Sequence, residues 1–173
     1  MIQKEADLKR LDPKMIKFKT GIGYDAHPFV TGKPLIIGGI AIPYKYGLDG
    51  HSDADVLIHA IIDSLLGAGA NTDIGCVFPD SNDEYKNIDS AVMLDKTAKI
   101  IKNNNYGISN IDTVIIAEEP KFSPFFKDMR KKLSTILGIS SDDISIKATT
   151  TETMGFTGRK EGIACISVAL LEK

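Results

Sequence analysis

Hydrophobic and polar positions recur regularly along the chain from residue 18 onward. The most distinct case is an apolar run at helical spacing, Val56–Leu66, which follows the polar segment Ser52–Asp55 and stops at Gly67. Serine and aspartate oxygens cap helix N-termini, and glycine is typical of the point where a helix ends. The pattern therefore predicts a helix here. Similar patterns predict two further helices, at 90–103 and 123–137.

Short apolar or alternating segments between and around these helices predict strands. They lie at 18–24, 35–42, 113–117, 144–148 and 163–171. The turn residues at 31–34 favour a hairpin between the first two strands, and 71–82 is expected to be a loop. The resulting order, β-β-α-α-β-α-β-β, predicts an α+β fold, a two-layer sheet-and-helix domain.

The N-terminal segment differs from the rest of the chain. Residues 1–17 are rich in charged side chains and contain Pro13, which interrupts a helix. We expect a charged, solvated N-terminal extension at 1–17, followed by a single domain at 18–173.

Composition argues against two classes of partner. Charged residues make up 25% of the chain, but the formal net charge is only -2, which lacks the basic excess of a nucleic-acid binder. No run of 18 apolar residues is available to span a membrane. Cys76 and Cys165 are far apart without a CxxC pattern, so neither a disulfide framework nor a cysteine-rich zinc site is expected.

All three histidines fall within one stretch, residues 27–59. Asp25 and His27 are two apart at the end of a predicted strand, so their side chains share a face, and His59 is the obvious third ligand. Two imidazoles and one carboxylate leave a tetrahedral zinc one open position, as in catalytic sites. Asp55 or Asp63, at i-4 and i+4, is expected to orient the His59 ring. The alternative is that Asp25 caps a turn and His59 is a hydrogen-bonded core histidine.

A second candidate site follows the strand at 144–148, where consecutive threonines precede Glu152. Hydroxyls and backbone N–H groups suit phosphate oxygens, and a carboxylate suits Mg²⁺. The alternative is a capping box, because Thr149-x-x-Glu152 matches that pattern. Gly155 and Gly158 follow where a helix would need better helix formers, which favours a shaped loop.

Several segments, in order and covering about 20–173, together resemble one enzyme family. They are Gly21–His27, Gly50–Asp55 with His59, Asp73–Gly75, Phe78–Asp80, Ala117–Lys121, Ala148–Arg159 and Glu161–Cys165. Each motif alone is weak, but the ordered set resembles the 2-C-methyl-D-erythritol 2,4-cyclodiphosphate synthase family.

The resemblance implies a lyase of the non-mevalonate (methylerythritol phosphate) pathway of isoprenoid and terpenoid biosynthesis. Such an enzyme converts 4-diphosphocytidyl-2-C-methyl-D-erythritol 2-phosphate to the 2,4-cyclodiphosphate and CMP, by metal-assisted attack of the 2-phosphate on the β-phosphate. The attacking group is already an anion, so no strong general base is required. The family also implies a homotrimer with active sites at subunit interfaces.

The same resemblance assigns roles to individual residues. It makes Asp25, His27 and His59 the zinc ligands, gives Glu152 a second ion, Mg²⁺ or Mn²⁺, and makes His51 and Thr150 catalytic. Implied substrate contacts on the methylerythritol and phosphate side are Asp25, Ala26, His27, His51, Ser52, Asp73, Ile74, Gly75, Phe78, Pro79, Asp80, Ser81 and Asn82. Those on the cytidine and diphosphate side, from a neighbouring subunit, are Ala117, Glu118, Glu119, Pro120, Lys121, Phe122, Ser123, Thr149, Thr150, Thr151, Glu152, Phe156 and Arg159.

Some features depart from the family pattern or leave alternatives open. Cys76 and the pair Glu118–Glu119 stand where many members carry other residues. The excess of Lys over Arg and the Asn run, with the N-terminal extension, favour a plastid-type organelle (stroma or apicoplast), with bacterial cytoplasm as the alternative. Two rival functions are a zinc hydrolase and a non-catalytic trimeric binding module whose zinc has a fourth protein ligand.

Overall fold

The computed structural model describes residues 16–50, 52–79, 82, 85 and 88–173. Its strands are β1 (Phe18–Val30), β2 (Leu35–Ile37), β3 (Ile40–Ile42), β4 (Gly47–Leu48), β5 (Gly107–Ile116), β6 (Ile144–Thr149) and β7 (Gly162–Glu172). Its α-helices are α1 (Val56–Gly69), α2 (Ile74–Val77), α3 (Ser90–Asn103), α4 (Phe126–Leu137) and α5 (Gly155–Gly158), with 3-10 turns η2 (Ser123–Phe125) and η3 (Ser141–Asp143).

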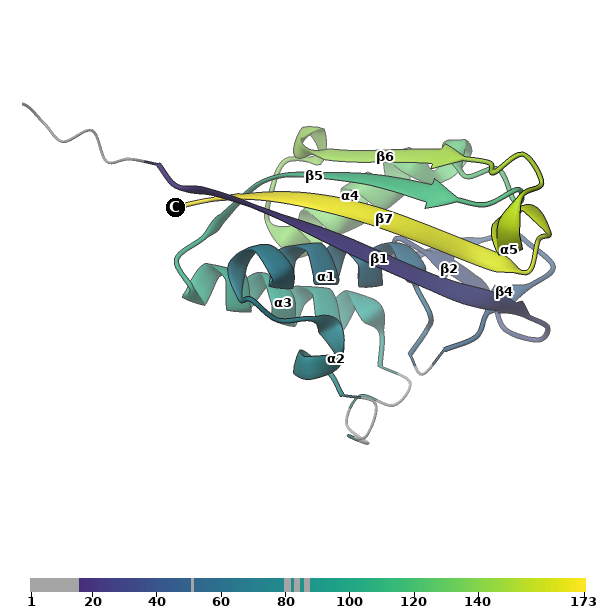
Figure 1. Cartoon of the computed structure of the whole chain (residues 1–173), viewed down its shortest axis with the longest axis horizontal. Helices are drawn as coiled ribbons and strands as arrows, with labels where there is room; N and C mark the ends of the chain where they lie inside the picture. The colour runs from purple at the N-terminus through teal and green to yellow at the C-terminus, as the bar shows by residue number, and fades with distance from the viewer. Residues whose placement is uncertain (1–15, 51, 80–81, 83–84, 86–87) are drawn as a thin grey trace, which may run out of the picture.

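A main sheet, a layer of helices and a small second sheet make up the architecture (Figure 1). The sheet has the strand order β4-β1-β7-β5-β6, and β2 and β3 form a separate two-stranded sheet. Strands β1 and β5 both run antiparallel to β7, while β5 and β6 are parallel. Helix α1 packs on β1 and β7, and α3 contacts both α1 and α4. The predicted two-layer α+β fold is confirmed. None of the helices in the described part of the chain has the length and apolar character to cross a bilayer.

The predicted hairpin between the first two strands is wrong. Strand β1 pairs with β7 and, at its end, with β4. The segment predicted as one strand at 35–42 is itself a hairpin, because Gly38 and Gly39 take φ values of 62° and 71° and reverse the chain between β2 and β3. Consecutive residues with positive φ are typical of a tight hairpin turn.

The other predicted elements occur with shifted limits. Strands β1 and β5 are longer than the sequence predicted, and the helix predicted at 123–137 begins as η2 before α4. The expected loop at 71–82 contains the short helix α2, whose first turn Asp73 caps by accepting a hydrogen bond from Cys76 N at 2.8 Å. Of the predicted extension at 1–17, only 16 and 17 are among the described residues. Lys17 exchanges two backbone hydrogen bonds with Lys173, both 2.9 Å long.

Helix α1 starts at a buried carboxylate. Asp55 accepts hydrogen bonds from the backbone N–H groups of Ile58 (3.1 Å), Gly38 (2.9 Å) and Gly39 (2.6 Å). Burial raises the pKa of Asp55 to about 6, and these N–H groups limit the rise. Asp55 therefore caps α1 and at the same time holds the β2–β3 turn against the start of that helix.

Two glycines of β1 allow α1 to approach the sheet closely. A Cβ atom at Gly21 would lie 2.0 Å from the carbonyl oxygen of Ser64, and one at Gly23 would lie 2.0 Å from that of Ala60. Real Cβ atoms do not approach backbone this closely, so any side chain at these positions would push α1 away from β1. The distance between the strand and the helix therefore depends on these glycines.

We predict that Gly23→Ala lowers the free energy of unfolding by about 1–3 kcal/mol or more, because the added methyl group overpacks the helix contact. Gly67→Ala, at an exposed position of α1, is the matched control. A Cβ atom at Gly67 meets nothing within 4 Å, so that change should be neutral or stabilise by up to about 1 kcal/mol. Urea unfolding measures both variants, and equal stabilities would contradict the close approach.

Candidate metal centre

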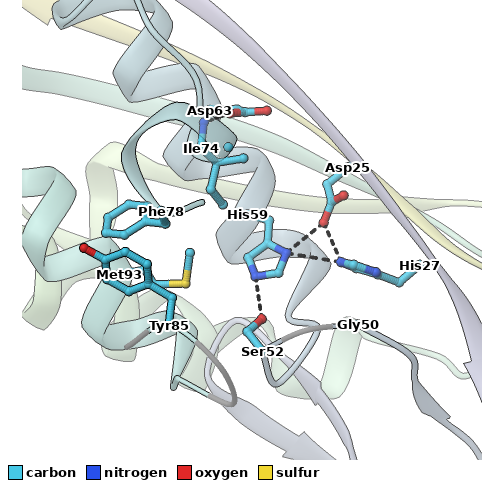
Figure 2. Close-up of a pocket in the computed structure, with 11 residues that line it drawn as sticks. Asp25, His27, Gly50, Ser52, His59, Asp63, Ile74, Phe78, Tyr85 and Met93 are labelled. Atoms are coloured by element: carbon cyan, nitrogen blue, oxygen red, sulfur yellow. Dashed lines mark hydrogen bonds and ion pairs between the residues drawn. The ribbon is translucent and has the colours of Figure 1, made fainter. Parts of the chain in front are cut away.

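Three side chains from two elements meet at one point. Asp25 and His27 come from the same face of β1, and His59 comes from α1. Asp25 Oδ2 lies 2.9 Å from His59 Nδ1 and 3.0 Å from His27 Nε2, and the two nitrogens are 3.2 Å apart. Figure 2 shows the three side chains pointing toward one another. Within the described residues, they form the group of three donors close enough to share one ion.

This geometry suits a divalent metal. Zinc binds imidazole nitrogen and carboxylate oxygen at about 2.0–2.2 Å, so donors of a tetrahedral site lie about 3.3 Å from one another. The three observed separations, 2.9 to 3.2 Å, need only slight expansion to admit such an ion. Nitrogen and oxygen donors of this kind are those that zinc takes in catalytic sites.

The charges of the cluster favour a cation. Burial alone would raise the pKa of Asp25, but hydrogen bonds from His27 and His59 outweigh it and hold that pKa well below its usual range. Burial likewise opposes protonation of His59, and the Asp25 carboxylate outweighs this and raises the pKa of His59. Asp25 is therefore an anionic donor, and a metal ion would displace a proton from the imidazole beside it.

The far side of the His59 ring contacts hydroxyl groups. Its Nε2 lies 2.9 Å from Ser90 Oγ and 3.0 Å from Ser52 Oγ. The prediction that Asp55 or Asp63 orients this ring is wrong. Asp55 caps α1, and Asp63 accepts a hydrogen bond from Ile74 N at 2.8 Å. His59 is buried and hydrogen-bonded, as in the alternative of a core histidine. Its Nδ1, however, faces two other potential metal ligands, Asp25 Oδ2 and His27 Nε2.

The cluster forms one wall of a pocket of about 330 Å³. The opposite wall is apolar, and there the rings of Phe78 and Tyr85 pack edge to face with centroids 5.4 Å apart (Figure 2). The lining residues are Asp25, His27, Gly50, Ser52, His59, Asp63, Ile74, Gly75, Phe78, Tyr85 and Met93. A pocket with metal-ligating groups on one side and apolar groups on the other suits a small molecule that has a polar and a hydrocarbon part.

Not every residue of this pocket is recognisable from the sequence. Gly50 stands out only as part of a motif that resembles the family, and the spacing of Asp63 suggests only a partner of His59. Tyr85 and Met93 match no motif. Met93 belongs to the buried face of α3, so its helical spacing marks it as internal but does not say that it borders a pocket. Nothing in the sequence near Tyr85 distinguishes it from other aromatic residues.

Comparison with known proteins identifies the family. The model of the YgbB family matches residues 18–172. A Bacillus cytotoxicus protein named 2-C-methyl-D-erythritol 2,4-cyclodiphosphate synthase is 53% identical over 156 residues, which are 90% of this chain and 99% of that protein. A Bacillus mycoides protein of the same name matches with the same identity and coverage. The chain belongs to the 2-C-methyl-D-erythritol 2,4-cyclodiphosphate synthase family. The resemblance seen in the motifs, and with it an enzyme family, is confirmed.

Solved structures of the cyclodiphosphate synthase family have the same fold. The bifunctional IspDF of Campylobacter jejuni matches with a TM-score of 0.88 and 38% identity, over 96% of this chain and 46% of that one. This chain thus spans about half of the bifunctional protein. IspF of Plasmodium falciparum, in a CDP complex, matches with a TM-score of 0.78 and 37% identity, over 89% and 95% of the two chains.

The residues that the resemblance led us to expect on the cytidine and diphosphate side lie outside this pocket. Ala117–Ser123, Thr149–Glu152, Phe156 and Arg159 do not line it. Of the described residues expected on the methylerythritol and phosphate side, six line it and four do not. Those that line it are Asp25, His27, Ser52, Ile74, Gly75 and Phe78, and those that do not are Ala26, Asp73, Pro79 and Asn82. His51, Asp80 and Ser81 lie outside the described residues.

The segment 149–153 is a shaped loop. Thr149 ends β6, and the N-cap position of the next helix, α5, is Met154, which makes no side-chain capping hydrogen bond, so the capping-box alternative for Thr149 and Glu152 is wrong. Glu152 and Thr153 take φ values of 53° and 67°, which are rare for residues with side chains. The exposed Glu152 accepts a hydrogen bond from Thr150 Oγ1 at 2.5 Å.

Two glutamates at the end of β5 hold this loop and its continuation. Glu118 accepts hydrogen bonds from Thr151 N at 3.0 Å and Thr153 N at 3.3 Å. Glu119 accepts hydrogen bonds from Lys160 Nζ and, at 3.2 Å, from Tyr44 Oη. These two carboxylates therefore make intramolecular contacts.

Proposed function

We propose that this chain converts 4-diphosphocytidyl-2-C-methyl-D-erythritol 2-phosphate to 2-C-methyl-D-erythritol 2,4-cyclodiphosphate and CMP, a step of the non-mevalonate isoprenoid pathway. The observation that carries the proposal is the Asp25–His27–His59 cluster on the wall of a pocket, in a chain 53% identical to proteins with that synthase name. In this reaction the 2-phosphate oxygen forms a bond to the β-phosphorus, and the bond from that phosphorus to CMP breaks.

The chain's own residues have to align the two reacting groups rather than abstract a proton. Ile74, Phe78 and Met93 offer an apolar wall for the methylerythritol part, and the Asp63 carboxylate can accept hydrogen bonds from its hydroxyls. Ser52 offers a hydroxyl beside the cluster for a phosphate oxygen. Alignment of attacking and leaving groups within a pocket contributes much of the rate acceleration of such a displacement.

We also propose which metal ions bind to these residues. Asp25, His27 and His59 would hold Zn²⁺, and Glu152 would hold Mg²⁺ or Mn²⁺ together with phosphate oxygens of the substrate. When bound, zinc at the three donors supplies positive charge and one open position for a phosphate oxygen. A structural zinc would need a fourth protein ligand, and the donor group among the described residues has three members.

We also propose a homotrimer with active sites shared between subunits. Across the sheet, Ala26 pairs with Ala164, Ala164 with Ile116, and Ile116 with Thr149. Three strand spacings of about 4.8 Å therefore put Thr149 about 14 Å from Ala26. Adjacent phosphates of one diphosphate are much closer together, so the donor cluster and the Thr149–Glu152 loop of one chain are poorly placed to share it. A neighbouring subunit can supply the second half.

The sheet face away from the helices offers a surface for those neighbours. Ile22, Tyr24 and Val168 are 71%, 54% and 43% exposed, and Ile22 pairs directly with Val168. Gly21 and Gly23 face α1, so the alternating Ile22 and Tyr24 point away from the helix layer. Contiguous exposed apolar residues of this kind mark interaction surfaces.

We also propose a location for the protein, the bacterial cytoplasm. The Bacillus relatives are bacterial and lend no support to the plastid-type organelle suggested by the composition. They favour the alternative, bacterial cytoplasm.

The activity is tested by incubating the protein with the cytidine diphosphate substrate and Mg²⁺ in ¹⁸O-labelled water, followed by phosphorus NMR and mass spectrometry. The proposed cyclase yields CMP and a cyclic diphosphate without solvent oxygen. A zinc hydrolase would incorporate ¹⁸O, and a binding module would leave the substrate unchanged. Either result would contradict the proposal.

We predict that His59→Ala loses stoichiometric zinc and reduces activity by about 100-fold or more, because one of three protein donors is removed. The protein should stay folded, since a core of this size does not depend on a metal. Metal analysis measures the zinc content of the variant, and circular dichroism shows whether it stays folded. Full zinc occupancy in the variant would show that His59 is not a ligand, and global unfolding would instead indicate a structural metal.

We expect Glu152→Gln to keep zinc but to raise the Mg²⁺ concentration needed for half-maximal activity by about tenfold, because a neutral amide replaces an anionic donor. Titration of activity with Mg²⁺ measures the change. Glu161→Gln, which alters another exposed carboxylate, one paired with Arg159, serves as the matched control. The same Mg²⁺ response in both variants would remove Glu152 from the metal site.

Shared sites predict complementation between inactive variants. His59→Ala and Lys121→Ala, mixed under conditions of subunit exchange, should regenerate some intact sites and recover activity. The Lys121 variant must first be impaired on its own, with Lys127→Ala, another exposed lysine, as its control. Exchange shown by native mass spectrometry without any recovered activity would place each site within a single chain.

A further inference from the structure

The outer nitrogen of the His59 ring is bound by a chain of hydrogen bonds that reaches a carboxylate. His59 Nε2 lies 2.9 Å from Ser90 Oγ, and Ser90 is completely buried at the start of α3. The Ser90 hydroxyl in turn donates to Asp53 Oδ1, and the Ser90 backbone N–H donates to Asp53 Oδ2 at 3.2 Å. Asp53 thus grips Ser90 through both of its oxygens.

The direction of these hydrogen bonds follows from the donors available. An ionised carboxylate only accepts, so the single hydroxyl hydrogen of Ser90 is directed at Asp53. Ser90 Oγ can then only accept from His59, and His59 Nε2 must carry a hydrogen. In a neutral imidazole this leaves the lone pair on Nδ1, the atom that faces Asp25 and His27.

Ser52 is a second neighbour of His59 Nε2, but nothing fixes its direction. Its Oγ lies 3.0 Å from Nε2, is 3.4 Å from Ser90 Oγ, and accepts a hydrogen bond from Ala54 N at 3.2 Å. Ser52 is only half-buried, and no carboxylate accepts its hydrogen in the described part of the chain. Ser90 is therefore the directed partner of the ring.

We propose that Asp53 and Ser90 are positioning residues of the metal centre, an inference that rests on the proposed zinc site. They keep the hydrogen of His59 on Nε2 and hold the ring so that Nδ1 faces the ion. Outer partners of this kind fix the tautomer and orientation of metal-binding histidines. The same bonds tie the loop before α1 to the first turn of α3.

Zinc affinity, measured by competition with a chelator on the full-length protein, tests the inference. Ser90→Ala and Asp53→Ala should each bind zinc about 10–100-fold more weakly than the wild type. Ser64→Ala is the matched control, because Ser64 is also a buried serine and its hydroxyl contacts Ile61 O and Ser167 Oγ, away from the cluster. Its affinity should stay within about twofold. Ser90→Thr keeps the hydroxyl and should recover most of the affinity.

A spectroscopic measurement separates positioning from a general loss of stability. In zinc-loaded protein labelled with ¹⁵N-histidine, which has only three histidines, the His59 Nε2–H signal should be visible and protected from solvent exchange. In Asp53→Ala the Ser90 hydroxyl is still present but no longer directed, so this signal should exchange faster. If a variant fails to fold, the wild-type spectrum still tests the inference, because a His59 Nε2 without a hydrogen would overturn it.

The possible failures are distinguishable. If the wild type binds zinc, and Ser90→Ala and Asp53→Ala bind it as tightly as Ser64→Ala does, only the positioning role is overturned. A wild-type chain that takes up no zinc would contradict the proposed metal site itself, and the positioning role with it.

Discussion

Helix α1 lies against strand β1 at a distance that only glycine permits. With no side chains at Gly21 and Gly23, the carbonyl oxygens of Ser64 and Ala60 sit where Cβ atoms would otherwise stand. Asp25 and His27 follow on the same strand, and His59 precedes Ala60 on the helix. The separation of 2.9 Å between Asp25 and His59 is therefore a consequence of backbone packing. A wider strand-to-helix distance would leave three donors that could not share one ion.

Two carboxylates, Asp55 and Asp53, fix the start of helix α1 through hydrogen bonds to different elements. Asp55 is directed inward, where it caps α1 and binds the β2–β3 turn. Asp53 is directed toward α3, where it binds Ser90. Each carboxylate satisfies backbone N–H groups that burial would otherwise leave unpaired, at a cost of about 1–3 kcal/mol each. The position of His59 one turn further along α1 thus depends on contacts with two other elements.

How much of this site could be predicted from the sequence depends on the range of the contact. Helix α1 and the Asp25–His27 pair were predictable, because spacing along one element fixes which side chains share a face. Ser90 was not, since it meets His59 across 31 residues of chain and its own surroundings show only a helix start. Asp55 and Asp63 have suitable spacing from His59, but their carboxylates accept hydrogen bonds from the backbone N–H groups of Gly38 and Ile74 instead. The hairpin prediction failed because paired glycines within an apolar segment permit a turn that the apolar pattern does not show.

The strand order gives the two candidate halves of the site different surroundings. Strand β1 lies second from one edge of the sheet, beneath α1 and beside a pocket with an apolar wall. Strand β6 forms the opposite edge, and the loop that follows it is exposed, with Glu118 fixing the backbone of Thr151 and Thr153. The donor cluster therefore lines a pocket of its own chain, whereas Thr150 and Glu152 lie on an exposed loop whose backbone is hydrogen-bonded to Glu118. In the proposed trimer, the donor cluster of one chain and the Thr149–Glu152 loop of its neighbour can therefore face a single diphosphate. Within one chain the two are separated by about 14 Å of sheet.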